Sequence, residues 1–250
     1  MKITPSLCFA LASLLAILAC ARSARADRDI VYAARYYLPP GSSETSHFHL
    51  YRINPDGSGK TQITFGDADD ENPRWSPDGR KILFIRTDQL AASAACIVNA
   101  HGSGLATLPG SGQDGRLADC RWSPNGRSAL LTWDNSATLV NLASRQERRL
   151  TNATAAYWSP DSKKCYIAST QGADRILDCA TGKSSDVKVQ TYGMPFDGQK
   201  VVWLDSQALA GIGSKLDSGD VFLTTFDIKG KIIRKTLCQW PHSKAAPYLG

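Results

Sequence analysis

The histidines at positions 47 and 49 have the spacing of a metal-binding pair. One residue separates His47 from His49, so on a β-strand both imidazole rings face the same side. Zinc sites use such rings together with further ligands. No third ligand stands out in the sequence, so we predict no metal site and a hydrogen-bonded or exposed pair that belongs to the binding face.

A group of carboxylates follows in the segment GDADDENP, residues 66–73. Its acidic members are Asp67, Asp69, Asp70 and Glu71. Carboxylate oxygens can ligate calcium, but the spacing differs from that of an EF-hand loop. We therefore expect a solvated acidic loop that offers Asp69 and Asp70 to a binding partner, and we predict no cofactor.

The sequence lacks the common signatures of nucleophilic and phosphate chemistry. The stretch GIGSKLDSG, residues 211–219, differs from the Gly-x-Ser-x-Gly motif of α/β-hydrolases. Residues 102–115 are rich in glycine but lack the strand-to-helix context that phosphate binding requires. We therefore predict that the protein is not an enzyme.

The first 26 residues have the pattern of a signal peptide. Lys2 precedes an uncharged apolar run at residues 7–18, and residues 24–26 have the small-x-small form that signal peptidase cuts. We predict a mature domain at residues 27–250, exported to the periplasm or secreted. Lipidation at Cys20 and an uncleaved anchor are the alternatives.

The charge of the mature chain argues against a nucleic-acid partner. Three basic residues leave with the signal peptide, so 29 − 3 = 26 basic residues face 23 acidic ones, a net charge of +3. No later window approaches the roughly 20 apolar residues that a spanning helix requires. We expect a monomer without a membrane span.

Five cysteines remain after the predicted cleavage. They are Cys96, Cys120, Cys165, Cys179 and Cys238. Cys165 and Cys179 are each about seven residues from a turn near Gly172, so we expect them to face each other across a hairpin and to form a disulfide bond. The states of the other three cysteines stay open.

An internal repeat dominates the rest of the chain. RWSPDGRKILFI at residue 74 returns as RWSPNGRSALLT at 121, as YWSPDSKKCYIA at 157 and, in worn form, as GMPFDGQKVVWL at 193. Anchored on Trp75, Trp122, Trp158 and Met194, the spacings are 47, 36 and 36. Between the anchors, hairpin patterns begin at residues 49, 95, 137, 175 and 221. Five hairpins indicate five repeats.

The repeated turn has a specific chemistry. In Pro77-Asp78-Gly79 the proline fixes φ, and the glycine accepts the left-handed conformation that closes a hairpin. Ser162 replaces this glycine in a later copy, so we expect strain there. The predicted structural anchors are Trp75, Pro77, Asp78, Gly79, Trp122, Pro124, Gly126, Trp158 and Pro160.

Repeats of 36 to 47 residues with four short strands each predict a single all-β propeller of four-stranded antiparallel blades. We favour five blades and keep six as the alternative. The first repeat begins at its second strand, IVYAA from Ile30. We expect LCQWPHSKA, from Leu237, to complete that blade and remove an open edge.

The WSPDG anchors resemble the TolB-type (WD-like) propeller repeat, which also occurs in the propellers of prolyl-oligopeptidase-type peptidases. The resemblance covers about residues 30–240. It implies a propeller fold, and it says little about function because the motif residues form turns and core.

Function is expected in the long, unlike loops at the end of the strands opposite the repeated turns. The longest begin at Arg35 (RYYLPPGSSETSHF) and at Asp205 (DSQALAGIGSKLDSG). The first supplies Arg35, Tyr36 and Tyr37, residue types common at protein interfaces. The leading hypothesis is therefore a non-catalytic, TolB-like propeller that binds a protein or a cell-envelope polymer through this face.

Two other functions remain open. Asp88, Asp134 and Asp205 each follow a predicted strand, and two or three carboxylates at a tunnel mouth would suit a carbohydrate-active hydrolase. The third possibility is an accessory subunit of an envelope complex, attached through a lipidated Cys20.

Overall fold

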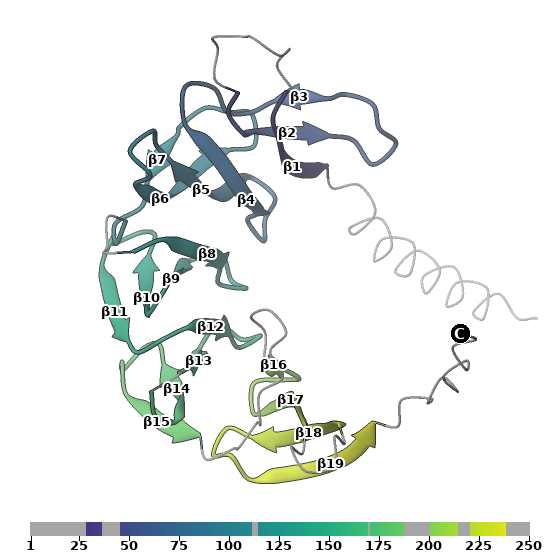
Figure 1. The fold of residues 1–250 in the computed structure, drawn as a ribbon, viewed down its shortest axis with the longest axis vertical. Helices are drawn as coiled ribbons and strands as arrows, with labels where there is room; N and C mark the ends of the chain where they lie inside the picture. The colour runs from purple at the N-terminus through teal and green to yellow at the C-terminus, as the bar shows by residue number, and fades with distance from the viewer. Residues whose placement is uncertain are drawn as a thin grey trace, which may run out of the picture. The chain divides into compact units, whose positions relative to one another are not determined.

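A computed structural model describes residues 29–36, 46–111, 115–169, 171–187, 201–214 and 221–238. The regular elements among these residues are β-strands, which form five antiparallel sheets (Figure 1). The chain divides into two compact units, residues 1–92 with 96–106 and residues 93–95 with 107–250.

The first unit holds the first sheet and most of the second. The first sheet has the order β1-β2-β3 and the second β4-β5-β6-β7. Their strands are β1 Ile30–Ala34, β2 His49–Ile53, β3 Thr61–Gln62, β4 Asp69–Trp75, β5 Lys81–Thr87, β6 Ser93–Asn99 and β7 Ala106–Thr107. β1 and β2 both contact β4. Apolar side chains of these strands, such as Leu50 and Ile82, are fully buried.

The second unit holds the third, fourth and fifth sheets. The third consists of β8 Leu117–Trp122, β9 Ser128–Trp133, β10 Ser136–Asn141 and β11 Glu147–Thr151. The fourth consists of β12 Ala155–Trp158, β13 Lys164–Ala168, β14 Asp174–Asp178 and β15 Ser184–Val187. The fifth consists of β16 Val201–Trp203, β17 Ala208–Ser214, β18 Val221–Asp227 and β19 Ile232–Cys238. One apolar cluster joins the third sheet to the fourth, and another joins the fourth to the fifth.

The predicted fold class is confirmed: the chain is all-β and has the sheets of a β-propeller. The five predicted hairpins are formed by β2 and β3, β6 and β7, β10 and β11, β14 and β15, and β18 and β19. The first sheet has three described strands and begins with β1, as the pattern IVYAA predicts.

The repeated turn has the predicted conformation. Gly79 N–H donates to the Ser76 carbonyl at 2.9 Å, and Gly79 has a φ of 73°. The Asp78 carboxylate accepts hydrogen bonds from the Ser76 hydroxyl at 2.6 Å and from Arg80 N–H at 3.1 Å. Ser162 adopts a φ of 62°, which is the strained left-handed backbone expected where serine replaces glycine.

The fifth sheet corrects the assignment of the last repeat. Its first strand ends at Trp203, just as the first strands of the second, third and fourth sheets end at Trp75, Trp122 and Trp158. A short turn follows, and β17 occupies residues 208–214 of the loop predicted at residues 205–219. The prediction chose Met194, which lies outside the described residues, because GMPFDG preserves the turn residues, whereas Trp203 is followed by Leu-Asp-Ser-Gln.

The prediction of a solvated acidic loop is wrong, because Asp69, Asp70 and Glu71 belong to β4. A register shift between Glu71 and Arg74 bends this strand, and Asp70 is fully buried. Its carboxylate accepts two hydrogen bonds from Arg86, at 2.7 and 2.8 Å. The sequence did not indicate this ion pair, because Asp70 and Arg86 lie 16 residues apart and meet only when β4 pairs with β5.

The predicted Cys165–Cys179 disulfide is absent from the structure, which has both residues as thiols. The register pairs Cys165 with Leu177, so Cys179 lies diagonally across β13 and β14 rather than directly opposite. The two sulfur atoms are 3.6 Å apart, a distance at which one thiol can donate to the other. Burial raises the pKa of Cys165, and the hydrogen bond from Cys165 lowers the pKa of Cys179.

Several predictions fall outside the described residues. They concern the signal peptide at residues 1–26, the start of the mature chain and most of the closing segment that begins at Leu237. Leu237 and Cys238 themselves lie in β19 and pair with β18. Within the described part of the chain, no helix has the length and apolar character needed to cross a membrane.

Candidate binding pocket

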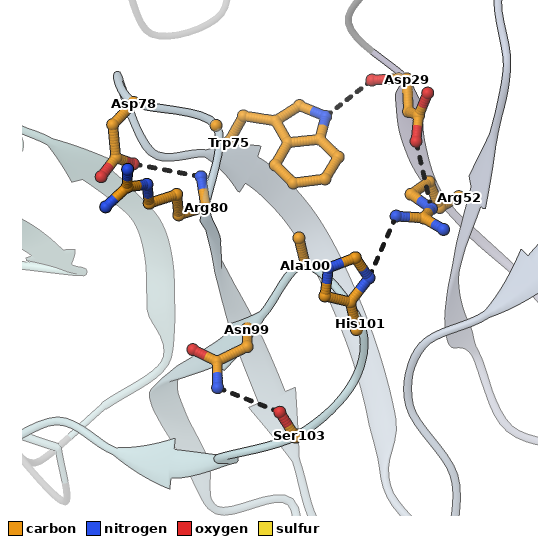
Figure 2. A pocket seen from close by; sticks show the side chains of 10 residues that line it. Asp29, Arg52, Trp75, Asp78, Arg80, Asn99, Ala100, His101 and Ser103 are labelled. Atoms are coloured by element: carbon orange, nitrogen blue, oxygen red, sulfur yellow. Dashed lines mark hydrogen bonds and ion pairs between the residues drawn. The ribbon is translucent and has the colours of Figure 1, made fainter.

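A pocket of about 570 Å³ lies where the first and second sheets meet (Figure 2). It opens at their turn end, which we define as the end of the sheets that carries the Trp-Ser-Pro turns and the turns between β2 and β3 and between β6 and β7. The lining residues are Asp29, Arg52, Trp75, Asp78, Gly79, Arg80, Asn99, Ala100, His101 and Ser103. The volume is within the roughly 300–1,000 Å³ common for ligand sites.

Trp75 forms a fixed apolar wall of this pocket. The residue ends β4 and is half-buried, and its indole Nε1–H donates to the carbonyl oxygen of Asp29 at 2.8 Å. Indole has no other polar atom. The ring is therefore held by the first sheet, and what it offers to a ligand is its flat hydrocarbon surface.

The first sheet supplies an ion pair, and the arginine of that pair also contacts a histidine of the second sheet. Arg52 Nε lies 3.1 Å from Asp29 Oδ2, and Arg52 Nη1 lies 3.5 Å from Nδ1 of His101 (Figure 2). Because a guanidinium only donates, Nδ1 of a neutral His101 accepts and Nε2 carries the proton. His101 is exposed, so this N–H can donate to a ligand.

The second sheet contributes the other side of the pocket. A hydrogen bond from the Ser76 hydroxyl, with a second from Arg80 N–H, lowers the pKa of Asp78, so this carboxylate stays ionised at neutral pH. Asn99 Nδ2 donates to the Ser103 hydroxyl at 3.1 Å. The side chain of Arg80 is exposed, and its guanidinium is available to a ligand. The rim of the pocket therefore combines donors with acceptors.

The same position in the second unit is filled. Leu139 lies two residues before Asn141, which begins the turn after β10, and Arg52 lies two residues before Asn54, which begins the turn after β2. Cys179 N–H donates to the Lys163 carbonyl as Ala100 N–H donates to the Arg80 carbonyl, so Cys179 corresponds to Ala100. Leu139, Trp158 and Cys179 pack against the apolar cluster that joins the third and fourth sheets. Asn125 N–H also donates to the Ser162 hydroxyl at 3.0 Å, which links the two neighbouring turns.

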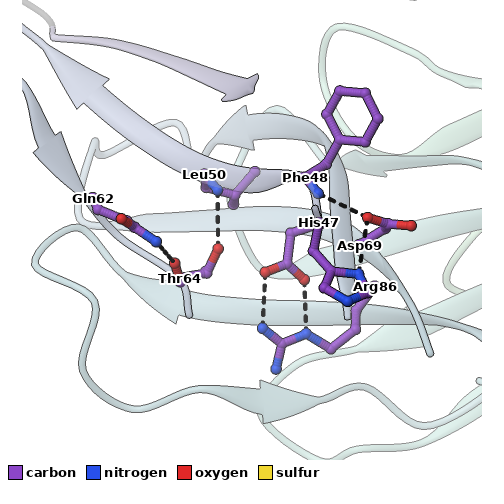
Figure 3. A network of polar contacts seen from close by, with 8 residues as sticks. His47, Phe48, Leu50, Gln62, Thr64, Asp69 and Arg86 are labelled. Atoms are coloured by element: carbon purple, nitrogen blue, oxygen red, sulfur yellow. Dashed lines mark hydrogen bonds and ion pairs between the residues drawn. The ribbon is translucent and has the colours of Figure 1, made fainter. Parts of the chain in front are cut away.

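The structure brings several predicted site residues together at the opposite, loop end of the first unit (Figure 3). His47 Nδ1 lies 3.5 Å from Asp69 Oδ1, and the same oxygen accepts from Phe48 N–H at 2.7 Å. Asp70 and Arg86 form the buried ion pair beside them, and the Asp70 carboxylate raises the pKa of Arg86. These contacts hold β2 against β4 and β5, which is a structural role.

Two further predicted residues lie beside that network, since Arg35 contacts Phe48 and the Tyr36 carbonyl accepts from the Ser46 hydroxyl. Arg35 lies over the ring of Phe48 at 4.9 Å, and the exposed Tyr36 meets the ring of Tyr51 edge-on at 6.1 Å. His49 has a buried Nδ1 without a hydrogen-bond partner. Tyr37 lies outside the described residues. No three metal-ligating side chains of the described ranges come together as a metal site.

The carboxylates of the hydrolase hypothesis bind backbone groups of their own sheets. Asp88 Oδ1 accepts from Leu90 N–H and Ala92 N–H at 2.9 Å each. Asp134 Oδ2 accepts from Arg116 N–H at 3.0 Å. Asp205 Oδ1 accepts from Gln207 N–H at 2.6 Å and Ala208 N–H at 2.8 Å, which places it in a Trp-type turn rather than after a second strand.

The sequence prediction missed the pocket, although one signal was present. When the hairpins are aligned on their turns, Arg52 occupies the position of Ile97, Leu139 and Ile176. The fifth hairpin has Thr225 at this position, so Arg52 is the one charged residue there among the five hairpins, and such a charge marks a seam between sheets that is built differently.

Comparison with known proteins supports the fold. No family profile matches the sequence. A stretch of 97 residues is 32% identical to the uncharacterized peptidase YuxL of Bacillus subtilis, and the match covers 36% of this chain and 13% of that protein. The chain therefore corresponds to a small part of the curated relative.

Solved structures with a similar fold include two kinds of propeller. A putative TolB from Agrobacterium tumefaciens is 17% identical, with a TM-score of 0.51 over 84% of this chain and 80% of that one. The β-propeller domain of the Trilobed protease from Pyrococcus furiosus is 14% identical, with a TM-score of 0.55 over 82% and 67%. A mutant puromycin hydrolase is 15% identical, with a TM-score of 0.60 over 84% of this chain and 36% of that one.

These similarities define the class of protein. The chain is a β-propeller that resembles TolB and the propeller domains of peptidases, and the identities support the fold alone.

Proposed function

We propose that this protein is an exported, non-catalytic, TolB-like propeller that binds a protein or a cell-envelope polymer. The observation that carries the proposal is the pocket beside Trp75. It combines a fixed aromatic wall with several hydrogen-bonding groups, the arrangement that specific binding sites use. We place the ligand in this pocket.

The long-loop end is the less favoured surface. Asp70 is fully buried against Arg86 and cannot reach a partner, and Oδ1 of the partly exposed Asp69 already accepts from Phe48 N–H. Tyr36 stays exposed, and binding through it remains a prediction from the sequence.

A hydrolytic function has less support. Asp88, Asp134 and Asp205 each accept hydrogen bonds from backbone groups of their own sheet, which stabilises turns. A glycosidase requires two carboxylates within roughly 5–10 Å of each other that act on one substrate.

Capture from an envelope extract tests the proposal with a matched control. Arg80 and Arg127 are exposed and occupy the same turn position, since Arg127 N–H donates to Asn125 as Arg80 N–H donates to Asp78. Arg80→Ala should reduce recovery of a bound component about tenfold, the effect of losing one charged hydrogen bond, and Arg127→Ala should not. Equal recovery with both variants would contradict the location of the site.

A further inference from the structure

We propose that the ligand of the Trp75 pocket is a neutral saccharide unit that stacks on the indole. This inference rests on the proposed function and specifies the class of polymer. It follows from three properties of the lining residues: the aromatic wall, the charge balance and the alternation of donors and acceptors.

The aromatic wall selects a ligand with a flat apolar face. Because Trp75 Nε1–H is already bonded to the Asp29 carbonyl, the indole contributes packing and no hydrogen bond to the ligand. A pyranose ring has a face of C–H groups that covers such a surface, and burying that face against the ring is favourable.

The charges in the pocket balance. Asp29 and Asp78 carry negative charge, and Arg52 and Arg80 carry positive charge. Two carboxylates would repel an anionic ligand, and two guanidinium groups would repel a cationic one. An apolar ligand would remove water from Asp78 and Arg80 without offering them hydrogen bonds, at a cost of about 1–3 kcal/mol for each, whereas Asp29 and Arg52 pair with each other. The balance therefore favours a neutral polar ligand.

The rim matches hydroxyl groups, which both donate and accept. Arg80 and His101 present donors, and Asp78 presents an ionised acceptor. Asn99 Oδ1 already accepts from Lys81 Nζ at 3.1 Å, so Asn99 offers its second amide N–H, and the Ser103 hydroxyl can donate. Figure 2 shows Asp78 and Arg80 to one side of the indole and Asn99, His101 and Ser103 below it, so a ring stacked on Trp75 would have hydrogen-bonding groups along its edge. Planar groups such as guanidinium and carboxylate can bind two neighbouring hydroxyls at once.

A calorimetric titration of the purified protein tests this inference. The probes are triacetylchitotriose and maltotriose, which are neutral, trigalacturonic acid, which is anionic, and the peptide Ala-Ala-Ala. We expect a neutral trisaccharide to bind, with affinity reduced about tenfold or more by Arg80→Ala and unchanged by Arg127→Ala. Trp75→Phe should retain weaker stacking, and thermal melting establishes that each variant is folded.

Each other outcome has a defined meaning. Binding of the peptide or of the anionic sugar alone would overturn the saccharide assignment, as would no binding of any probe. Sugar binding that is insensitive to Arg80→Ala would overturn its location. If the envelope capture still depends on Arg80 while no saccharide binds, the proposed function stands and the saccharide inference fails.

Discussion

The seam between the first and second sheets and the seam between the third and fourth are built on the same turns but filled differently. The third–fourth seam places Leu139, Trp158 and Cys179 on an apolar cluster. The first–second seam has Arg52, Trp75 and Ala100 at the corresponding positions, and there a pocket remains open. The first–second seam therefore has Arg52 and Ala100 where the third–fourth seam has Leu139 and Cys179.

This difference separates the role of the repeat from the role of the site. The Trp-Ser-Pro turn has the same hydrogen bonds at Ser76, Ser123 and Ser159, so it supplies the scaffold of the second, third and fourth sheets. Under the proposed function, specificity would come from the residues that the neighbouring sheet presents beside Trp75.

The largest expected effect is on stability and concerns the ion pair between Asp70 in β4 and Arg86 in β5. Asp70→Ala should lower the free energy of unfolding by about 1.5–3 kcal/mol, because it removes the carboxylate that binds the half-buried Arg86 guanidinium through two hydrogen bonds. Chemical denaturation measures the change. Asp69→Ala, at a partly exposed carboxylate, should cost clearly less. Equal losses in both variants would refute a special role for the buried pair.

An exchange between the seams should remove the charged side of the pocket. Arg52→Leu introduces the residue found at Leu139, so we expect it to reduce affinity for the captured component or for the trisaccharide about tenfold or more. Stability should change by no more than about 1 kcal/mol, because the Asp29–Arg52 pair is partly exposed. Calorimetry and thermal melting measure the two quantities, and unchanged affinity would show that the open seam is not the binding site.

A smaller effect distinguishes the two tryptophans. Trp75→Phe loses the hydrogen bond to the Asp29 carbonyl, whereas Nε1 of Trp158 is buried without a partner. We expect Trp75→Phe to be more destabilising than Trp158→Phe by about 1 kcal/mol in urea denaturation. The reverse order would mean that the two indoles are not held as described.

The smallest effect concerns the turn arginines. Arg80→Ala and Arg127→Ala should each change stability by less than about 0.5 kcal/mol, because both side chains are exposed. Their melting temperatures should agree within error. A clear loss in Arg80→Ala alone would mean that its effect on binding is indirect.

The sequence was sufficient for the features that repeat locally. Trp75, Trp122 and Trp158 with their turns, and the strand that starts at Ile30, lie as predicted, because proline and glycine determine the turn within a few residues. The fifth repeat was misplaced because Trp203 lacks the Ser-Pro-Asp-Gly residues that mark the others.

Features that depend on distant partners were not predictable in the same way. Asp70 belongs to an acidic run that is typical of solvated loops, and its burial depends on Arg86 in the next strand. The pocket depends on Arg52 and Asp29 in the first sheet meeting Trp75 in the second. Cys165 and Cys179 are near each other as expected, but a register difference of two residues places them diagonally.

The most direct test of the central claim compares the two seams in one experiment. Indole N–H resonances of the ¹⁵N-labelled protein, assigned with Trp75→Phe and Trp158→Phe, are followed while the trisaccharide that binds most tightly is added. The account predicts a saturable shift of the Trp75 resonance and none at Trp158. A shift at Trp158 alone, or at neither residue while calorimetry records binding, would contradict it.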